Sequence, residues 1–274
     1  MSISINTLCE KMKKEKYYIY GTGFVAERFV EVIKDWNLCG NFEGFITTDG
    51  KEEKYKGQKV ISILTAETEA MDSLICIAVH ESNAIDIKKK LQEKGLNNSV
   101  WIYPLIFDLW YGTPIVKSVP FNINKILDSC ADDYRIPVRL LAIENYFKKN
   151  NVGYSIYKKA IALHSSVETA DKRLIRFIDL ISSWDKHGYD TTSVIKIDQD
   201  NNVFDGVHRL ALAYYFEIKE IRCDIYSTKG KREYINDEVK LTEDIISKID
   251  FSKEEKKVLD DCYRLFKKSI KSVK

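Results

Sequence analysis

The sequence lacks closely spaced cysteines, long apolar runs and a recognisable leader. Its six cysteines are scattered without a CxxC pair, and we interpret them as the reduced thiols of a cytoplasmic protein. The N-terminal residues show no basic start followed by an apolar centre and a small-residue cleavage site, so no secretion signal is expected. Because no run of about 18 apolar residues occurs, we predict no membrane partner.

Neither sign of charge is in surplus. Lysine and arginine total 43 and aspartate and glutamate total 41, which gives a formal net charge of +2. This near-balance lacks the basic footprint of nucleic-acid-binding proteins, so we predict no nucleic-acid partner and expect any anion site to be local. Hydrophobic residues make up 45% of the 274 residues, enough for substantial cores, and the length favours two domains. A homo-oligomer is compatible with this composition.

Strand-like and helix-like segments alternate in the first 115 residues. Tyr17–Tyr20 is rich in β-forming residues, and apolar residues then recur at helical spacing. Gly44–Thr47 is predicted as a second strand. Ser73–His80 is a continuous apolar run, which is typical of a parallel strand buried on both faces. The alternation predicts an α/β fold with a Rossmann-like parallel sheet as the N-terminal domain, residues 1–115.

The first strand is followed by a glycine-rich turn, Gly21-Thr22-Gly23-Phe24-Val25-Ala26. Gly21 permits a tight turn, Gly23 lets a phosphate approach the backbone, and Ala26 allows close helix–sheet packing. The diphosphate of a nucleotide sugar or of a dinucleotide such as NAD would fit at the helix start. A purely structural or interface-forming domain is the alternative. The stretch Tyr17–Pro104 resembles the small Rossmann-like domains of sugar-modifying acetyltransferases and related surface-polysaccharide enzymes.

Residues 116–274 are predicted to form a second, α+β domain. The segment from Leu105 to Pro120 is expected to be a packed connector, and residues 121–187 are mainly helical in pattern. Two short strands, Val194–Ile197 and Val203-Phe204, then form a hairpin, and a helix and a third strand follow. The turn between the hairpin and this helix places acidic and basic groups close together.

That turn reads Asp205-Gly206-Val207-His208-Arg209. His208, Arg209 and the backbone N–H groups of a helix start converge there, and this combination favours phosphate. Gly206 would let the phosphate approach closely. Asp205 repels phosphate, but it could hold Mg²⁺ or accept the proton of a substrate hydroxyl. The alternative is structural: Asp205 caps the helix and Arg209 pairs with a neighbouring acid.

The surrounding pattern, (D/N)xxNxxxDGxHRLAxA between two strands, resembles the ParB/sulfiredoxin superfamily over about Ala170–Tyr226. Val207 stands where sulfiredoxin has its reactive cysteine, and the chromosome-partitioning branch has a different turn followed by a DNA-binding region. The free-serine kinases, with Asp-Gly-His-His-Arg, are the most similar branch. The resemblance implies that Gly206, His208 and Arg209 bind nucleotide phosphates and that Asp205 and His208 lie at the reacting centre.

The kinase branch also uses a glutamate base ahead of this turn, and Glu168 is the corresponding candidate. The alternative is that Glu168 only places negative charge in the first turn of a helix. The resemblance implies an ATP- or ADP-dependent phosphotransferase with Mg²⁺, acting on a hydroxyl of an amino acid, polyol or sugar, in surface-polysaccharide assembly. A non-catalytic nucleotide-binding regulatory protein is the second reading, and an NAD(P)-dependent sugar-modifying enzyme is the third.

Overall fold

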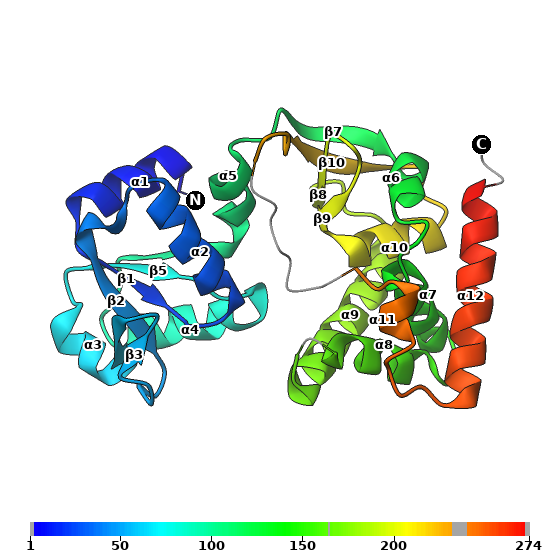
Figure 1. Ribbon diagram of the computed structural model, residues 1–274, viewed down its shortest axis with the longest axis horizontal. Coiled ribbons are helices and arrows are strands. Elements are labelled where there is room, and N and C mark those ends of the chain that lie inside the picture. Colours follow the sequence, from blue (N-terminus) through cyan, green and yellow to red (C-terminus); the bar gives the residue numbers. More distant parts are fainter. Residues whose placement is uncertain (1–2, 164, 232–239, 272–274) are drawn as a thin grey trace. The chain divides into compact units, whose positions relative to one another are not determined.

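The computed structural model describes residues 3–163, 165–231 and 240–271 (Figure 1). The chain is mixed α/β and divides into two compact units, Met1–Thr113 (unit 1) and Pro114–Lys274 (unit 2). Each unit has its own sheet and its own hydrophobic core. Among the described residues, no helix is long and apolar enough to cross a membrane. All six cysteines are free.

Unit 1 contains a six-stranded sheet in the order β3-β4-β2-β1-β5-β6, in which every neighbouring pair is parallel except β3 and β4. All residues of β1 and β5 are buried, as expected for apolar strands covered on both faces. The five parallel strands thus lie in the order β4-β2-β1-β5-β6. If they alone are counted along the chain, this is the doubly wound order 3-2-1-4-5. The bounds are β1 (Tyr17–Tyr20), β2 (Phe42–Thr47), β3 (Lys54–Tyr55), β4 (Gln58–Ser62), β5 (Leu74–Ile77) and β6 (Ser99–Trp101).

The helices of unit 1 follow the strands of this sheet. The Ser62 hydroxyl accepts the Thr65 N–H and so begins α3 directly after β4. Phe29 and Ile33 lie on the buried face of α2, at the spacing of an amphipathic helix. The bounds are α1 (Ile5–Lys14), α2 (Phe24–Asp35), α3 (Ile63–Glu69), α4 (Glu81–Glu93) and α5 (Ile106–Tyr111), with short 3₁₀ turns at Cys39–Asn41 and Tyr103–Leu105.

Unit 2 contains a four-stranded mixed sheet in the order β7-β10-β8-β9. β10 pairs in parallel with β8 and antiparallel with β7, and β8 and β9 form the predicted antiparallel hairpin. The strand β7 covers the end of the segment that the sequence predicted as a connector, so that prediction is wrong there. Its Pro120 is tolerated because β7 lies at an edge of the sheet. The bounds are β7 (Val116–Asn122), β8 (Val194–Asp198), β9 (Val203–Asp205) and β10 (Glu220–Tyr226).

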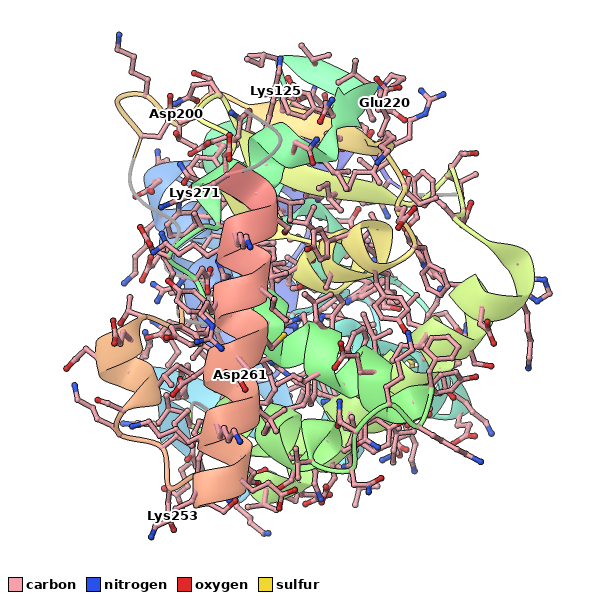
Figure 2. All side chains as sticks on the ribbon, turned by 90° about the vertical axis from the view of Figure 1, so that its right-hand side faces the viewer. Lys125, Asp200, Glu220, Lys253, Asp261 and Lys271 are labelled. Atoms are coloured by element: carbon pink, nitrogen blue, oxygen red, sulfur yellow. The ribbon has the colours of Figure 1, made fainter. Side chains whose placement is uncertain are left out.

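The helices of unit 2 enclose one continuous core. Figure 2 shows α12 along one face, with Lys253 and Lys271 at its two ends. This helix begins with a capping box, whose Ser-x-x-Glu pattern is visible in the sequence at 252–255: the Ser252 N–H donates to Glu255 and the Glu255 N–H donates to the Ser252 hydroxyl. The bounds are α6 (Ile123–Ser129), α7 (Arg135–Tyr146), α8 (Gly153–Ala162), α9 (Val167–His187), α10 (Val207–Tyr215), α11 (Glu243–Ile246) and α12 (Lys253–Lys271).

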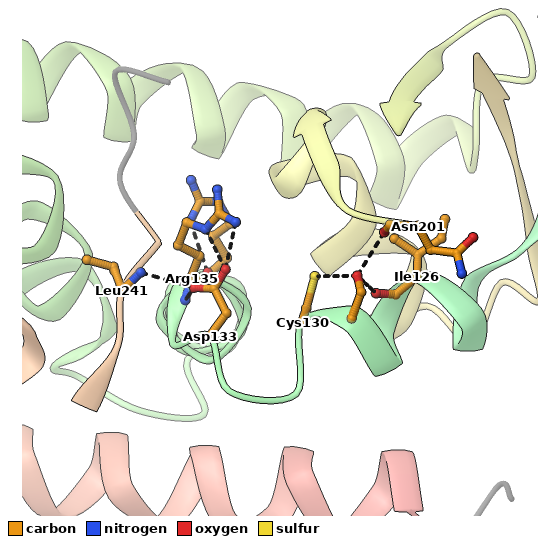
Figure 3. A network of polar contacts seen from close by, with 8 residues as sticks. Ile126, Cys130, Asp133, Arg135, Asn201 and Leu241 are labelled. Carbon is orange, nitrogen blue, oxygen red and sulfur yellow. Dashed lines mark hydrogen bonds and ion pairs between the residues drawn. The ribbon is translucent and has the colours of Figure 1, made fainter. Parts of the chain in front are cut away.

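A buried polar network fixes the start of α7 (Figure 3). The Asp133 carboxylate is 1% exposed, accepts the backbone N–H groups of Arg135 and Leu241, and pairs with the Arg135 guanidinium at 2.6 Å. Nearby, the Ser129 hydroxyl donates to the Asn201 carbonyl and so ties α6 to the β8–β9 turn. These contacts satisfy groups that would be costly to bury unpaired, and they hold the start of α7 in place.

Candidate functional site

The turn between β9 and α10 is built around a glycine in the left-handed region. Gly206 has φ +102° and is the N-cap of α10, with no side-chain hydrogen bond to the helix start. A Cβ there would lie 2.3 Å from Cγ2 of Ile195, a distance that no packing tolerates. Packing and backbone conformation therefore require glycine at this position, independently of any ligand. Asp205 does not cap the helix, because it is the last residue of β9.

Arg209 is anchored by the residues that surround it. One terminal nitrogen, Nη2, lies 3.0 Å from Oδ2 of Asp205, and the other donates to the Ser193 hydroxyl and the Val194 carbonyl. The two charged side chains are only 22% and 32% exposed. The structural alternative, in which Arg209 pairs with a neighbouring acid, is thus observed, and the acid is Asp205.

His208 lies against two aromatic rings. Its Nε2 is 2.7 Å from the Tyr157 hydroxyl, and its ring centre is 4.6 Å from that of Phe177 in an edge-on contact. The residue keeps some exposed surface, but burial of the ring and the positive charge of nearby arginines hold the pKa of His208 well below its ordinary value. The lowered pKa favours the neutral form of the imidazole.

Two arginines from other helices act on the imidazole of His208. Arg139 in α7 is fully buried, and its guanidinium carbon lies 5.9 Å from the centre of the Tyr157 ring. Arg173 precedes Phe177 by four residues in α9, so the two side chains share one helix face. The positive charges of Arg139, Arg173 and Arg209 all contribute to the lowered pKa of His208.

Sequence analysis did not identify Arg139, Arg173 or Tyr157. For Arg139 a signal exists, because it is the single charged residue in the apolar stretch Ile136–Ile143. A charge inside such a stretch of helix must be buried with partners or serve a site. Tyr157 and Arg173 occupy ordinary amphipathic helices, and no local pattern distinguishes them from core and surface residues.

Glu168 lies at the start of α9, far along that helix from the residue that contacts His208. It lies in the first turn of α9, its side chain is 77% exposed, and it pairs with Lys172 four residues later. The hydrogen bond from Lys172 lowers the pKa of Glu168. Phe177, which contacts His208, lies nine residues further along α9, or about 13.5 Å along the helix axis. The structure therefore brings Asp205, Gly206, His208 and Arg209 together, but it leaves Glu168 in a surface ion pair.

Asp205 is the metal candidate of the turn. Within the described ranges, no group of three or more histidine, cysteine or acidic side chains is placed to hold a metal ion. Mg²⁺ typically takes only one or two protein carboxylates and completes its shell with waters and substrate phosphates. A single carboxylate at Asp205 fits that role when a nucleotide supplies the remaining oxygens.

The glycine-rich turn of unit 1 lies where the strand order reverses, between β1 and β5. Gly21 has φ +107°, and a Cβ there would lie 3.1 Å from the side chain of Val79, just beyond β5. Gly23 is the N-cap of α2 without a side-chain hydrogen bond, and a Cβ added to it would meet nothing within 4 Å. The first glycine is therefore required by the fold, whereas the second leaves the helix start open.

Comparisons with protein-family models, curated proteins and solved structures gave no match. The function of this chain must therefore be inferred from the geometry of its two turns. Of the two, the turn at α10 has the richer chemistry, because it brings together a carboxylate, a guanidinium and an imidazole.

Proposed function

We propose that unit 2 binds the phosphate groups of ATP or ADP, with Mg²⁺, at the start of α10. The observation that supports this most is the start of α10 itself, where the Arg209 guanidinium lies beside a helix N-terminus that has no side-chain cap. Guanidinium groups match phosphate oxygens through paired N–H donors. The start of α10 has no side-chain cap, so its first N–H groups can also serve an anion.

The electrostatics of the cluster favour a multiply charged anion. The Arg209 guanidinium already pairs with one carboxylate, Asp205, at 3.0 Å. A polyphosphate carries several negative charges and would be attracted both to this guanidinium and to the uncapped N–H groups at the start of α10. Because the chain as a whole is near-neutral, such an anion site would be local.

We further propose that the site is a phosphotransferase acting on a hydroxyl of an amino acid, polyol or sugar. In this reaction the hydroxyl oxygen bonds to the terminal phosphorus of ATP, the bond to the bridging oxygen breaks, and ADP leaves. Asp205 is the carboxylate of the turn, and it would accept the hydroxyl proton or hold Mg²⁺. The resemblance of the turn to the free-serine-kinase branch of the ParB/sulfiredoxin superfamily supports this reaction.

The position of Glu168 favours a second candidate function. The kinase branch uses a glutamate base, and here that residue lies in a surface ion pair about 13.5 Å along α9 from Phe177. A unit that binds a nucleotide without turning it over needs no such base. Unit 2 would then be a regulatory nucleotide sensor.

One experiment separates the two candidates. Full-length protein is incubated with ATP, Mg²⁺ and a library of amino acids, polyols and sugars, and phosphorus NMR follows the products. Phosphotransferase activity predicts a phosphorylated acceptor that disappears in Asp205→Asn. Nucleotide binding by calorimetry without any product supports the sensor. No binding of ATP or ADP by the wild-type protein would refute both.

For unit 1, we propose a Rossmann-like domain that binds the diphosphate of a nucleotide sugar at Gly21–Gly23, in a protein of surface-polysaccharide assembly. The open helix start at Gly23 supports an anion there. A dinucleotide such as NAD would present the same diphosphate. Fluorescence titration with UDP-sugars and with NADH compares the two ligands, and Gly23→Ala should weaken whichever one binds, because a methyl group would occupy the space of the phosphate.

A further inference from the structure

The carboxylate of Asp205 lies close to the place where the proposed site would bind a phosphate. Its Oδ2 is 3.0 Å from Nη2 of Arg209. This nitrogen in turn lies 3.3 Å from the position that a Cβ on Gly206, the N-cap of α10, would take. The guanidinium and the helix start that would attract a phosphate therefore already have one negative charge beside them, and that charge belongs to the chain itself.

The two partners of this ion pair are held unequally. Nη1 of Arg209 donates to the Ser193 hydroxyl and to the Val194 carbonyl, so the guanidinium stays attached to the start of β8 even without Asp205. Within the part of the chain that the structure describes, the Asp205 carboxylate hydrogen-bonds to Arg209 alone, and its side chain is 32% exposed. The carboxylate is therefore the partner that can rotate away, while the guanidinium stays in place.

A phosphate and the Asp205 carboxylate would compete for the same nitrogen. With Nη1 bound to β8, Arg209 has donors left on Nε and Nη2. Contacts between arginine and phosphate are frequently bidentate, and such a contact would here use Nε–H and Nη2–H. The phosphate would then share Nη2 with the carboxylate, and two anions at one nitrogen repel each other. The phosphate carries more charge and also receives the N–H groups of the helix start, so the carboxylate should be displaced.

We propose that Asp205 is an internal competitor at the phosphate site: it holds Arg209 until a phosphate binds, and phosphate binding releases its carboxylate to hold a divalent cation. This inference rests on the phosphate site proposed above. The released carboxylate and the phosphate are two negative groups close together, and a divalent cation between them removes their repulsion. The ion pair thus keeps the carboxylate from holding a cation until the nucleotide has arrived.

The sign of one change in affinity tests the competition. Calorimetry measures the binding of ADP to the full chain, first with a chelator and then with Mg²⁺. Without metal, Asp205→Asn should bind ADP about tenfold more tightly than the wild-type protein, because the neutral amide no longer competes as an anion. With Mg²⁺ the order should reverse, since the wild-type carboxylate is the better ligand for the cation. Asp200→Asn, which removes the same charge from an exposed position in the β8–β9 turn, should leave both affinities unchanged.

A second measurement uses the wild-type protein alone and so does not depend on how a variant folds. Mn²⁺ replaces Mg²⁺ as a paramagnetic probe, and the relaxation of water protons follows its binding with and without sulfate. Sulfate should strengthen Mn²⁺ binding by about tenfold, and by linkage Mn²⁺ should strengthen sulfate binding by the same factor. Chloride at equal ionic strength controls for screening and should not strengthen Mn²⁺ binding.

The outcomes separate this inference from the proposed function. If ADP binds to the wild-type protein, but Asp205→Asn binds metal-free ADP equally or more weakly, then Asp205 is not a competitor and the phosphate site stands. A Mn²⁺ affinity that is independent of sulfate would overturn the release of the carboxylate to a cation, again without affecting the phosphate site. If neither ADP nor sulfate binds, the proposed phosphate site is wrong and the competition is wrong with it.

Discussion

Arg209 and Asp205 form an ion pair across the turn that joins β9 to α10, with 3.0 Å between Nη2 and Oδ2. The same guanidinium donates to the Ser193 hydroxyl and the Val194 carbonyl at the start of β8. Arg209 therefore joins the end of one strand to the beginning of its neighbour. The residue that the sequence assigns to phosphate thus also organises the turn, so its substitution will affect stability whether or not a phosphate binds.

Replacing Arg209 tests its contribution to stability. We expect Arg209→Ala to lower the free energy of unfolding by about 2 kcal/mol, because it removes charge-assisted hydrogen bonds and leaves Asp205 without its partner. Arg209→Lys should recover less than half of this loss, since one ammonium cannot reach all three acceptors. Urea unfolding measures both. Arg264→Ala is the control, because Arg264 is 76% exposed in its pair with Asp261, and a loss there as large as in Arg209→Ala would contradict this interpretation.

Gly206→Ala should be strongly destabilising. The new Cβ would meet Ile195 Cγ2 at 2.3 Å, and alanine disfavours φ +102°. Together these effects predict a loss of about 2–4 kcal/mol in the free energy of unfolding. Gly23→Ala is the matched control, since its Cβ meets nothing within 4 Å and its φ of −86° suits alanine. Thermal or urea unfolding measures both variants. Equal losses of stability would show that the clash of the new Cβ with Ile195 does not destabilise Gly206→Ala.

The lowered pKa of Glu255 predicts that the free energy of unfolding depends on pH. Burial alone would raise its pKa, but hydrogen bonds from Lys159, Ser155 and the Ser252 N–H outweigh burial and bring the pKa of Glu255 to about 2. A folded-state pKa below the ordinary value means that the stabilisation is complete above about pH 5 and is lost as the pH falls toward 2. We expect Glu255→Gln to cost about 2–3 kcal/mol at pH 7.

Urea unfolding of the wild-type protein and of Glu255→Gln at several pH values measures this dependence. The difference between the two proteins should shrink steadily below about pH 5. Asp261→Asn is the control, because Asp261 forms an exposed pair within the same helix, α12. A difference between wild type and Glu255→Gln that persists unchanged at the lowest pH would show that charge is not what Glu255 contributes.

The sequence predicted local structure better than distant partners. The capping box of Ser252 and Glu255 is a pattern of four consecutive residues, and both of its hydrogen bonds form. The contact of Glu255 with Lys159, 96 residues away, has no local signature. The same distinction explains β7, whose ladder with β10 spans about a hundred residues of chain and whose Pro120 reads locally as a strand breaker.

The candidate site shows the same limit. The residues of the turn itself were found because they are adjacent in sequence, from Asp205 to Arg209. Arg139 and Tyr157 reach the site only through the packing of α7 and α8 against α10 and α9. Glu168 was chosen by its spacing in the chain, and spacing alone does not tell how far along its helix a residue lies from the contact with His208.

Glu168→Gln tests that placement. Its carboxylate forms an exposed pair with Lys172, and the nearest contact of α9 with His208 lies about two and a half turns away at Phe177. We therefore expect Glu168→Gln to leave both the urea midpoint and the affinity for ADP with Mg²⁺ unchanged in calorimetry, because exposed pairs within one helix contribute little. Lys172→Gln, which removes the other partner, should behave in the same way. A large loss of nucleotide affinity or turnover in Glu168→Gln, with Lys172→Gln unaffected, would mean that the start of α9 approaches the phosphates when the nucleotide binds, and Glu168 would then regain the role of base.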